Sequence, residues 1–115
     1  MVRFDPTPYL PLTPAMFQVL VALADGEKHG YAVIKDVARR TDGKVRLRAG
    51  TLYTVIRRFV DDGLIQESAD RPDPALDDER RRYYRLTDRG RAVAVAEARR
   101  MADTLAQARA RLGAI

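Results

Sequence analysis

RAGTLYTVIRRFVDDGLI, residues 48–65, predicts a helix, a glycine stop and the start of a strand. Successive residues of an α-helix are rotated by about 100°, so apolar residues three and four apart share one face. With Leu52 at the centre of that face, three further apolar side chains fall on the same side: Val55, Ile56 and Phe59. We therefore predict a helix over residues 49–62 with this face buried.

The opposite face of the same helix is small, polar and basic. It carries Gly50, Thr54, Arg57 and Asp61, and it is flanked by Tyr53 and Arg58. A helix with such a face fits the major groove of DNA, where arginine reads guanine through its O6 and N7 atoms. The face is therefore a candidate for DNA recognition.

The basic composition of the chain favours a polyanionic partner. The 115 residues are enough for one domain with a modest core. The formal net charge is +5 and the sequence pI is about 10.0, which favours nucleic acid. A G+C-rich coding sequence would give the same excess of arginine, so the placement of the basic residues carries more weight than their number.

Cysteine is absent, which excludes disulfides, thiolate zinc sites and a cysteine nucleophile. No apolar run approaches the ~18 residues of a membrane span, and the N-terminus lacks the pattern of a signal peptide. We expect a cytoplasmic protein with no membrane partner and no cofactor.

Upstream of the central stretch, we predict an arm and two helices. Three prolines favour an extended N-terminal arm over residues 1–12. Thr13 is placed to cap a first helix that runs to about Asp25, and a second helix ends near Arg40. The alternation from Val45 to Leu47 predicts a short edge strand.

His29, the single histidine, lies in the loop before the second helix. A ligand or general base would need partners, and no cysteine or second histidine accompanies it. A capping or packing role is favoured. Gly30 beside it is expected to relieve crowding between backbones.

Downstream, the pattern predicts a hairpin. Residues 64–68 and 80–86 are predicted strands, joined by a polar loop over residues 69–79. Alternation places Arg81 and Arg82 on opposite faces of the returning strand. The order helix, helix, short strand, helix, hairpin describes a mainly α fold with a small β-hairpin, the winged helix-turn-helix. In this fold the helix over residues 49–62 would be the recognition helix and the hairpin over residues 64–86 would be the wing.

The last predicted element is a long helix, capped by Thr87 and running from Asp88 to about Leu112. About 25 residues give a rod of roughly 37 Å. Its apolar positions alternate steps of four and three, which is heptad spacing: Ala94, Ala98, Met101, Leu105, Ala108 and Leu112. This face either lies on the chain's own core or forms a seam with a second copy, and we favour a homodimer. The predicted domains are thus an arm (1–12), a winged helix (13–86) and a dimerisation helix (87–115).

Five segments together resemble the PadR family of bacterial transcriptional regulators. They are Leu12-Thr-Pro14, His29-Gly-Tyr31, Gly50-Thr-Leu-Tyr53, Asp62-Gly-Leu-Ile65 and Tyr83-Tyr-Arg-Leu-Thr87. The resemblance covers about residues 12–90. It implies a winged helix with a C-terminal dimerisation region, and repression at palindromic operators on double-stranded DNA. Phenolic or apolar compounds release some members, which implies a small apolar or aromatic effector here.

The resemblance assigns DNA contacts to the third helix and the wing. Arg57 is the candidate for guanine readout, whereas Thr51, Tyr53 and the wing arginines are expected to hold phosphates. The candidate DNA-binding residues are Lys35, Arg48, Thr51, Tyr53, Thr54, Arg57, Arg58, Arg81 and Arg82.

Two features depart from the family. The predicted wing tip is acidic: Asp70, Asp73, Asp77, Asp78 and Glu79 face only Arg71, so only the wing base should approach DNA. The C-terminal region is a single helix without tryptophan, and its alanines allow either a small effector pocket or close, dry packing between paired helices.

Other classes are less favoured. The sequence offers no nucleophile with a base, metal cluster or phosphate loop, so we do not expect an enzyme. A winged-helix module that binds RNA or protein, without operator specificity, would have the same fold. Salt-dependent duplex binding separates these readings.

Overall fold

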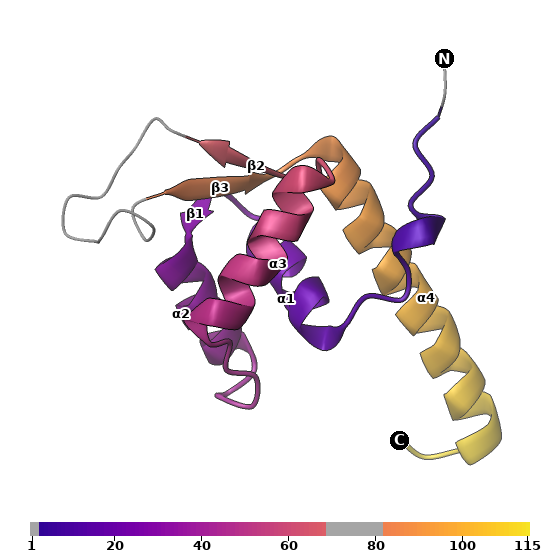
Figure 1. Cartoon of the computed structure of the whole chain (residues 1–115). Helices are drawn as coiled ribbons and strands as arrows, with labels where there is room; N and C mark the ends of the chain where they lie inside the picture. Colours follow the sequence, from indigo (N-terminus) through magenta and orange to yellow (C-terminus); the bar gives the residue numbers. More distant parts are fainter. Residues whose placement is uncertain (1–2, 69–81) are drawn as a thin grey trace.

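The computed structural model describes residues 3–68 and 82–115, which form a mainly helical fold with a small antiparallel sheet (Figure 1). Within these residues the elements follow the order 3₁₀-helix η1 (Thr7–Tyr9), α1 (Pro14–Ala22), β1 (Lys28–His29), α2 (Gly30–Arg40), α3 (Ala49–Asp61), β2 (Ile65–Ser68), β3 (Tyr83–Leu86) and α4 (Asp88–Leu112). Three helices followed by a hairpin make the winged helix-turn-helix predicted from the sequence.

Side-chain caps fix where the helices begin. The Oγ1 atoms of Thr13 and Thr87 accept hydrogen bonds from Met16 and Gly90, at 3.2 and 3.1 Å. Both predicted threonine caps are therefore confirmed. α1 is shorter than predicted, because the chain leaves the helix at Leu23 rather than at Asp25.

His29 caps α2, as the favoured interpretation of this residue requires. Its Nδ1 accepts the N–H of Ala32 at 3.0 Å. Its ring stacks on Tyr31 and meets the edge of Tyr83, with centroids 6.5 and 5.3 Å apart. The histidine therefore joins α2 to the sheet.

The core lies between the helices and one face of the sheet. The predicted apolar face of α3 is buried, since Leu52, Val55, Ile56 and Phe59 are all at most 7% exposed. The same core takes these residues from α1, α2 and α4: Val19, Leu20, Val33, Val37 and Val93. Gly63 follows α3 with a φ of +75°, the left-handed conformation expected after the helix end.

The sheet contains a strand that the sequence did not predict, β1. Its order is β1-β3-β2, and both neighbouring pairs are antiparallel. In the hairpin Ile65 pairs with Leu86 and Glu67 pairs with Tyr84. β1 has only two residues, which is too short to give a period-two signal.

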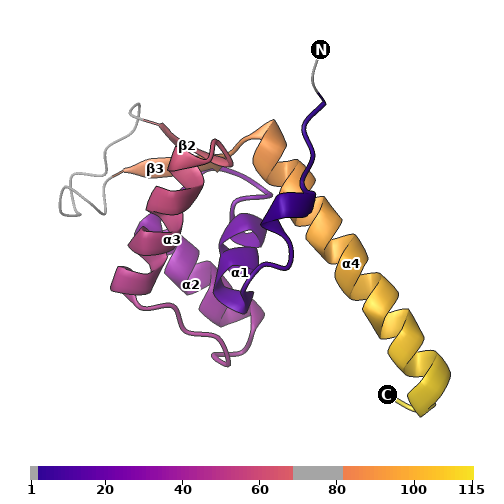
Figure 2. The same ribbon diagram turned by 45° about the vertical axis from the view of Figure 1, so that its right-hand side comes forward.

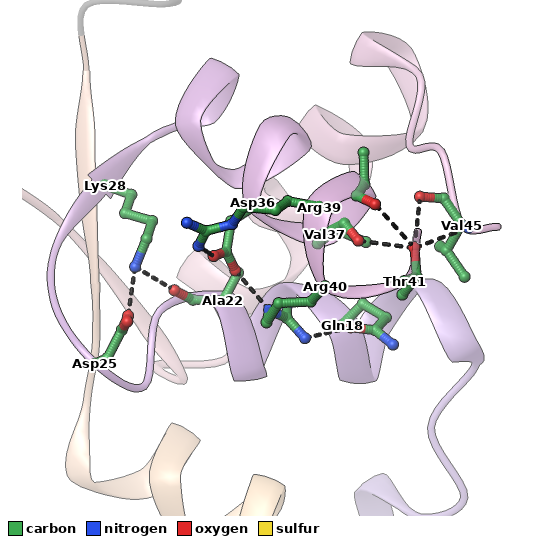
Figure 3. Close-up of polar contacts among 11 residues, drawn as sticks. Gln18, Ala22, Asp25, Lys28, Asp36, Val37, Arg39, Arg40, Thr41 and Val45 are labelled. Carbon is green, nitrogen blue, oxygen red and sulfur yellow. Dashed lines mark hydrogen bonds and ion pairs between the residues drawn. The ribbon is translucent and has the colours of Figure 1, made fainter. Parts of the chain in front are cut away.

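The predicted edge strand from Val45 to Leu47 is wrong, because these residues form an irregular loop. The Thr41 hydroxyl donates to the Val37 carbonyl at 2.8 Å and accepts the N–H of Val45 at 3.0 Å (Figure 3). This side chain satisfies the backbone group that a strand partner would otherwise bond. Leu47 still enters the core, at 8% exposed.

The N-terminal arm is not extended throughout, because Thr7–Tyr9 form a turn of 3₁₀-helix. Asp5 supplies a local acceptor for the N–H of Thr7 at 2.9 Å, and the Phe4 ring lies 6.1 Å from the ring of Tyr9. The arm ends at Leu12, whose N–H donates to the buried carboxylate of Glu97 on α4. It therefore packs on the chain's own C-terminal helix.

A polar network on α2 reaches across to α1 (Figure 3). Asp36 is only 7% exposed and bonds Arg39 and Arg40, each at 2.8 Å. Burial by itself raises the pKa of Asp36, but the hydrogen bonds from Arg40 and Arg39 outweigh it and hold the pKa below its ordinary value. Arg40 also donates to Gln18 of α1 at 3.0 Å.

α4 spans the predicted residues and has two different halves. Gly90, Val93 and Glu97 in its first half are buried against the winged helix. Its second half extends away from the other elements, as Figure 2 shows. Within the described residues, no helix combines the length and apolar character that a membrane crossing needs.

Candidate nucleic-acid interface

The outer face of α3 is the first part of the candidate interface. Its exposed side chains include Thr51, Thr54, Arg57 and Arg58, all four of them candidates from the sequence. The Thr54 hydroxyl donates to the carbonyl of Gly50 at 2.9 Å, which leaves the hydroxyl oxygen able to accept. This face therefore offers both hydroxyl and guanidinium groups.

α3 begins without any negative charge in its first turn. Arg48 stands at the N-cap with an exposed side chain, and it makes no side-chain capping bond. The free N–H groups and the positive end of the helix dipole favour a phosphate near this end. The arrangement suits a helix that enters a groove by its N-terminus.

Tyr53 differs from its neighbours because it is half-buried. Its phenol lies against Gly30, where a Cβ atom would come within 2.4 Å of the Tyr53 Oη. Gly30 therefore leaves room for a side chain, and the prediction that it relieves crowding between backbones is wrong. Tyr53 consequently links α3 to the start of α2.

An open cleft of about 140 Å³ separates α3 from the sheet. α3 contributes Tyr53, Ile56, Arg57, Val60 and Asp61 to its walls. The wing contributes Glu67, Arg82 and Tyr84. Two arginines from different elements, Arg57 and Arg82, therefore border the same space beside the exposed face of α3.

The remaining candidates lie around this centre. Lys35 is exposed on α2, with its ammonium 4.6 Å from the centre of the Tyr31 ring. Arg58 lies 4.0 Å from Asp62, one turn along α3. Arg81, the loop over residues 69–79 and the acidic wing tip lie outside the described residues.

The residues named for dimerisation follow the two halves of α4. Ala94 is partly buried and packs against the chain's own core. Beyond Glu97, Met101, Leu105 and Leu112 are 46%, 42% and 73% exposed. Ala98 is also exposed, whereas Ala108 is half-buried. The second half of α4 thus carries large apolar side chains on an open surface.

Among the described residues, the charged groups with lowered pKa values lie away from the cleft. The Arg100 hydrogen bond lowers the pKa of Glu97, against the effect of burial, and the Leu12 N–H adds to the lowering. Asp36 belongs to the network of α2. Within residues 3–68 and 82–115, no three His, Asp or Glu side chains gather in a way that could hold a metal ion.

Sequence reasoning missed Glu67, which lies 3.4 Å from Arg82 in the cleft. Alternation places Glu67 on the same strand face as the buried Ile65, and Arg82 on the face of Tyr84. The sequence did not predict which residues of the two strands pair, because the length of the connecting loop does not determine the register. With the register known, Glu67 lies opposite Tyr84 and therefore next to Arg82.

The fold defines a winged-helix protein, and the sequence identifies its family. Residues 19–96 match the transcriptional regulator PadR-like family, so the chain belongs to this family. Family members are transcription regulators that bind DNA.

Solved structures agree with the assignment. A PadR family transcription regulator from Clostridium difficile R20291 superposes with a TM-score of 0.69 at 21% identity, over 88% of this chain and 100% of that chain. A probable transcriptional regulator from Pseudomonas aeruginosa is 32% identical, with a TM-score of 0.59 over 88% of this chain and 67% of that chain. BpsR of Bordetella bronchiseptica, whose DNA binding is regulated by 6-hydroxynicotinic acid, is also 32% identical, with a TM-score of 0.57 over 81% and 64% of the two chains.

A curated relative, an uncharacterised protein of Lysinibacillus sphaericus, is 28% identical over 74 residues. The match covers 64% of this chain and 65% of that protein, a little under two thirds of its length.

Proposed function

We propose that the chain is a sequence-specific regulator of transcription that binds double-stranded DNA as a homodimer and represses at a palindromic operator. The observation that carries the proposal is the exposed face of α3, where Thr51, Thr54 and Arg57 stand beside the wing. Membership of a family of transcription regulators supports it.

The roles of the side chains follow from their chemistry. Arg57 projects from the middle of α3 and is suited to bidentate contact with guanine. Arg48, at the start of α3, and Arg82, at the wing base, are suited to phosphates, which carry no sequence information. Tyr53 supports the geometry of α3 from its position against Gly30. Arg81 remains a proposed phosphate contact, and Lys35 remains a proposed DNA-binding residue.

The second half of α4 is the proposed dimer seam. A helix that pairs with its own copy must present apolar side chains at heptad spacing, and Met101 and Leu105 are both exposed at that spacing. A two-fold dimer would present two copies of α3 to a symmetric site. We accordingly propose residues 87–115 as the dimerisation region.

A small aromatic effector is proposed for the same region. The relative BpsR responds to 6-hydroxynicotinic acid, and paired α4 helices here would enclose apolar atoms of Met101 and Leu105. Titration of a protein–DNA complex with aromatic acids of this size tests the idea. Release of the duplex at a saturable concentration supports it, and unchanged binding over the whole titration contradicts it.

Selection of bound duplexes from a random pool tests the main proposal. We expect a consensus with two inverted half-sites, and affinity for it that falls steeply with salt. Selection of single-stranded RNA instead, or enrichment without any consensus, would contradict operator recognition and favour the alternative winged-helix module.

A further inference from the structure

Glu67 is the one wing residue in the described part of the cleft whose charge opposes DNA binding. It lies on β2 opposite Tyr84. Arg82 is two residues before Tyr84, so alternation along the chain places both on the same face of the sheet. Tyr84 is only 4% exposed, so this face of the hairpin points toward α3. Glu67 and Arg82 therefore both project into the cleft beside the recognition helix.

The two side chains form an ion pair that water can reach. Their closest atoms, Arg82 Nε and Glu67 Oε1, are 3.4 Å apart, and the side chains are 58% and 40% exposed. An exposed pair of this kind contributes little to folding stability, because solvent screens the charges and the long side chains lose entropy. A stronger anion can therefore replace the carboxylate at Arg82 with little cost to the fold.

The other face of the hairpin is built differently. Arg85 lies there and donates to the neutral side chain of Gln66, with Nη2 and Nε at 2.7 and 3.2 Å from Oε1. Of the two arginines in the described part of the hairpin, Arg82, which faces the cleft, pairs with a carboxylate, whereas Arg85 bonds an amide. A carboxylate can therefore be moved from one face of the hairpin to the other without a change in net charge. Such a change separates the effect of the ion pair on DNA affinity from the effect of net charge.

We infer that Glu67 is a built-in counter-ion of Arg82, which a DNA phosphate must displace, and that it thereby limits the affinity for every duplex. The inference rests on the proposed DNA-binding function. A DNA phosphate can bind the Arg82 guanidinium only after the ion pair between Arg82 and Glu67 has broken. Arg82 contacts no base in this scheme, so Glu67 lowers operator and non-operator affinity alike.

The test is duplex binding by the full chain carrying Glu67→Gln, measured on a selected site and on an unrelated duplex of equal length. Glutamine keeps the size of the side chain and removes its charge. We expect about threefold tighter binding to both duplexes, and a salt slope steeper by up to about one counterion. Tighter binding to the selected site alone, or weaker binding to both, would overturn the inference.

Two further variants identify the cause. The double variant Gln66→Glu with Glu67→Gln keeps the net charge and moves the carboxylate to the face of Arg85, so it should keep the gain. A return to wild-type affinity would attribute the gain to net charge and overturn the inference. In an Arg82→Ala background, Glu67→Gln should have no effect, and a persisting gain would contradict the pairing with Arg82. If the unaltered chain binds no duplex in a salt-dependent way, the proposed function fails instead.

Discussion

Two glycines in helices differ in the space that a side chain would find. A Cβ at Gly90 of α4 would lie 2.0 Å from the carbonyl oxygen of Leu64, a backbone atom that cannot move aside. A Cβ at Gly50 of α3 would meet nothing within 4 Å. Gly90 therefore sets how closely α4 approaches the strand that starts the wing.

Gly90→Ala should lower the free energy of unfolding by about 3 kcal/mol or more, because the overlap forces α4 away from the hairpin. The matched change Gly50→Ala should raise it by up to about 1 kcal/mol, since alanine is the better helix former and has room. Urea unfolding followed by circular dichroism measures both. Equal effects of the two substitutions would contradict the packing at Gly90.

Glu97 makes stability depend on pH. Its pKa in the folded chain is lowered chiefly by the Arg100 hydrogen bond, so it lies below the ordinary pKa of a glutamate in an unfolded chain. The ionised carboxylate therefore stabilises the fold fully above that pH, and the contribution is lost as the pH falls through the folded-state pKa.

We expect the unaltered chain to be more stable than Glu97→Gln by about 1 kcal/mol at pH 7, with the difference shrinking as the pH falls below about 4. Urea unfolding of both proteins at pH 7 and pH 3 checks this. Asp103→Asn, an exposed acid on the same helix, serves as control. A difference that stays constant between the two pH values would show that charge on Glu97 is not involved.

At the scale of elements, the loop between α2 and α3 depends on one hydroxyl. Thr41→Val keeps the shape of the side chain but leaves the N–H of Val45 without its acceptor. Such a loss typically costs about 1–3 kcal/mol. Thr54→Val, on the exposed face of α3, should change stability by less than about 0.5 kcal/mol. Thermal unfolding compares the two, and a Thr41 variant as stable as the Thr54 variant would contradict the role of this hydroxyl.

The same loop shows what sequence patterns can and cannot predict. Helical periodicity identified the buried face of α3, and capping chemistry identified the starts of α1 and α4, because these signals are local. Val45 to Leu47 alternates like a strand, but a contact from Thr41 decides its conformation. β1 was missed for a related reason, since its pairing with Tyr83 and Tyr84 is a long-range event.

In the candidate interface, too, local features could be predicted from the sequence and contacts between elements could not. Exposure of Thr54 and Arg57 follows from 100° steps along one helix. The half-buried position of Tyr53 depends on the close approach of Gly30, and the pairing of Glu67 with Arg82 depends on strand register. Side chains on one element could be predicted from the sequence, whereas contacts between elements needed the fold.

For the whole molecule, assembly is the first property to test. Leu105→Asp places a charge among the exposed apolar side chains of α4 and should convert the proposed dimer into monomers. Ala110→Asp adds the same charge on a different side of the helix and should leave the dimer intact. Sedimentation equilibrium distinguishes the 13.0 kDa chain from its dimer. Dissociation by both variants, or by neither, would contradict the seam.

The central claim is that the exposed face of α3 reads DNA sequence, and Arg57→Ala tests it most directly. The measurement is the equilibrium affinity for a selected duplex and for an unrelated duplex, with Arg99→Ala on α4 as a control for loss of charge. We predict that Arg57→Ala weakens binding to the selected site by about tenfold or more, as expected for loss of a bidentate guanine contact, but changes binding to the unrelated duplex only as much as Arg99→Ala does. Equal losses for Arg57→Ala and Arg99→Ala on both duplexes would contradict sequence readout by α3.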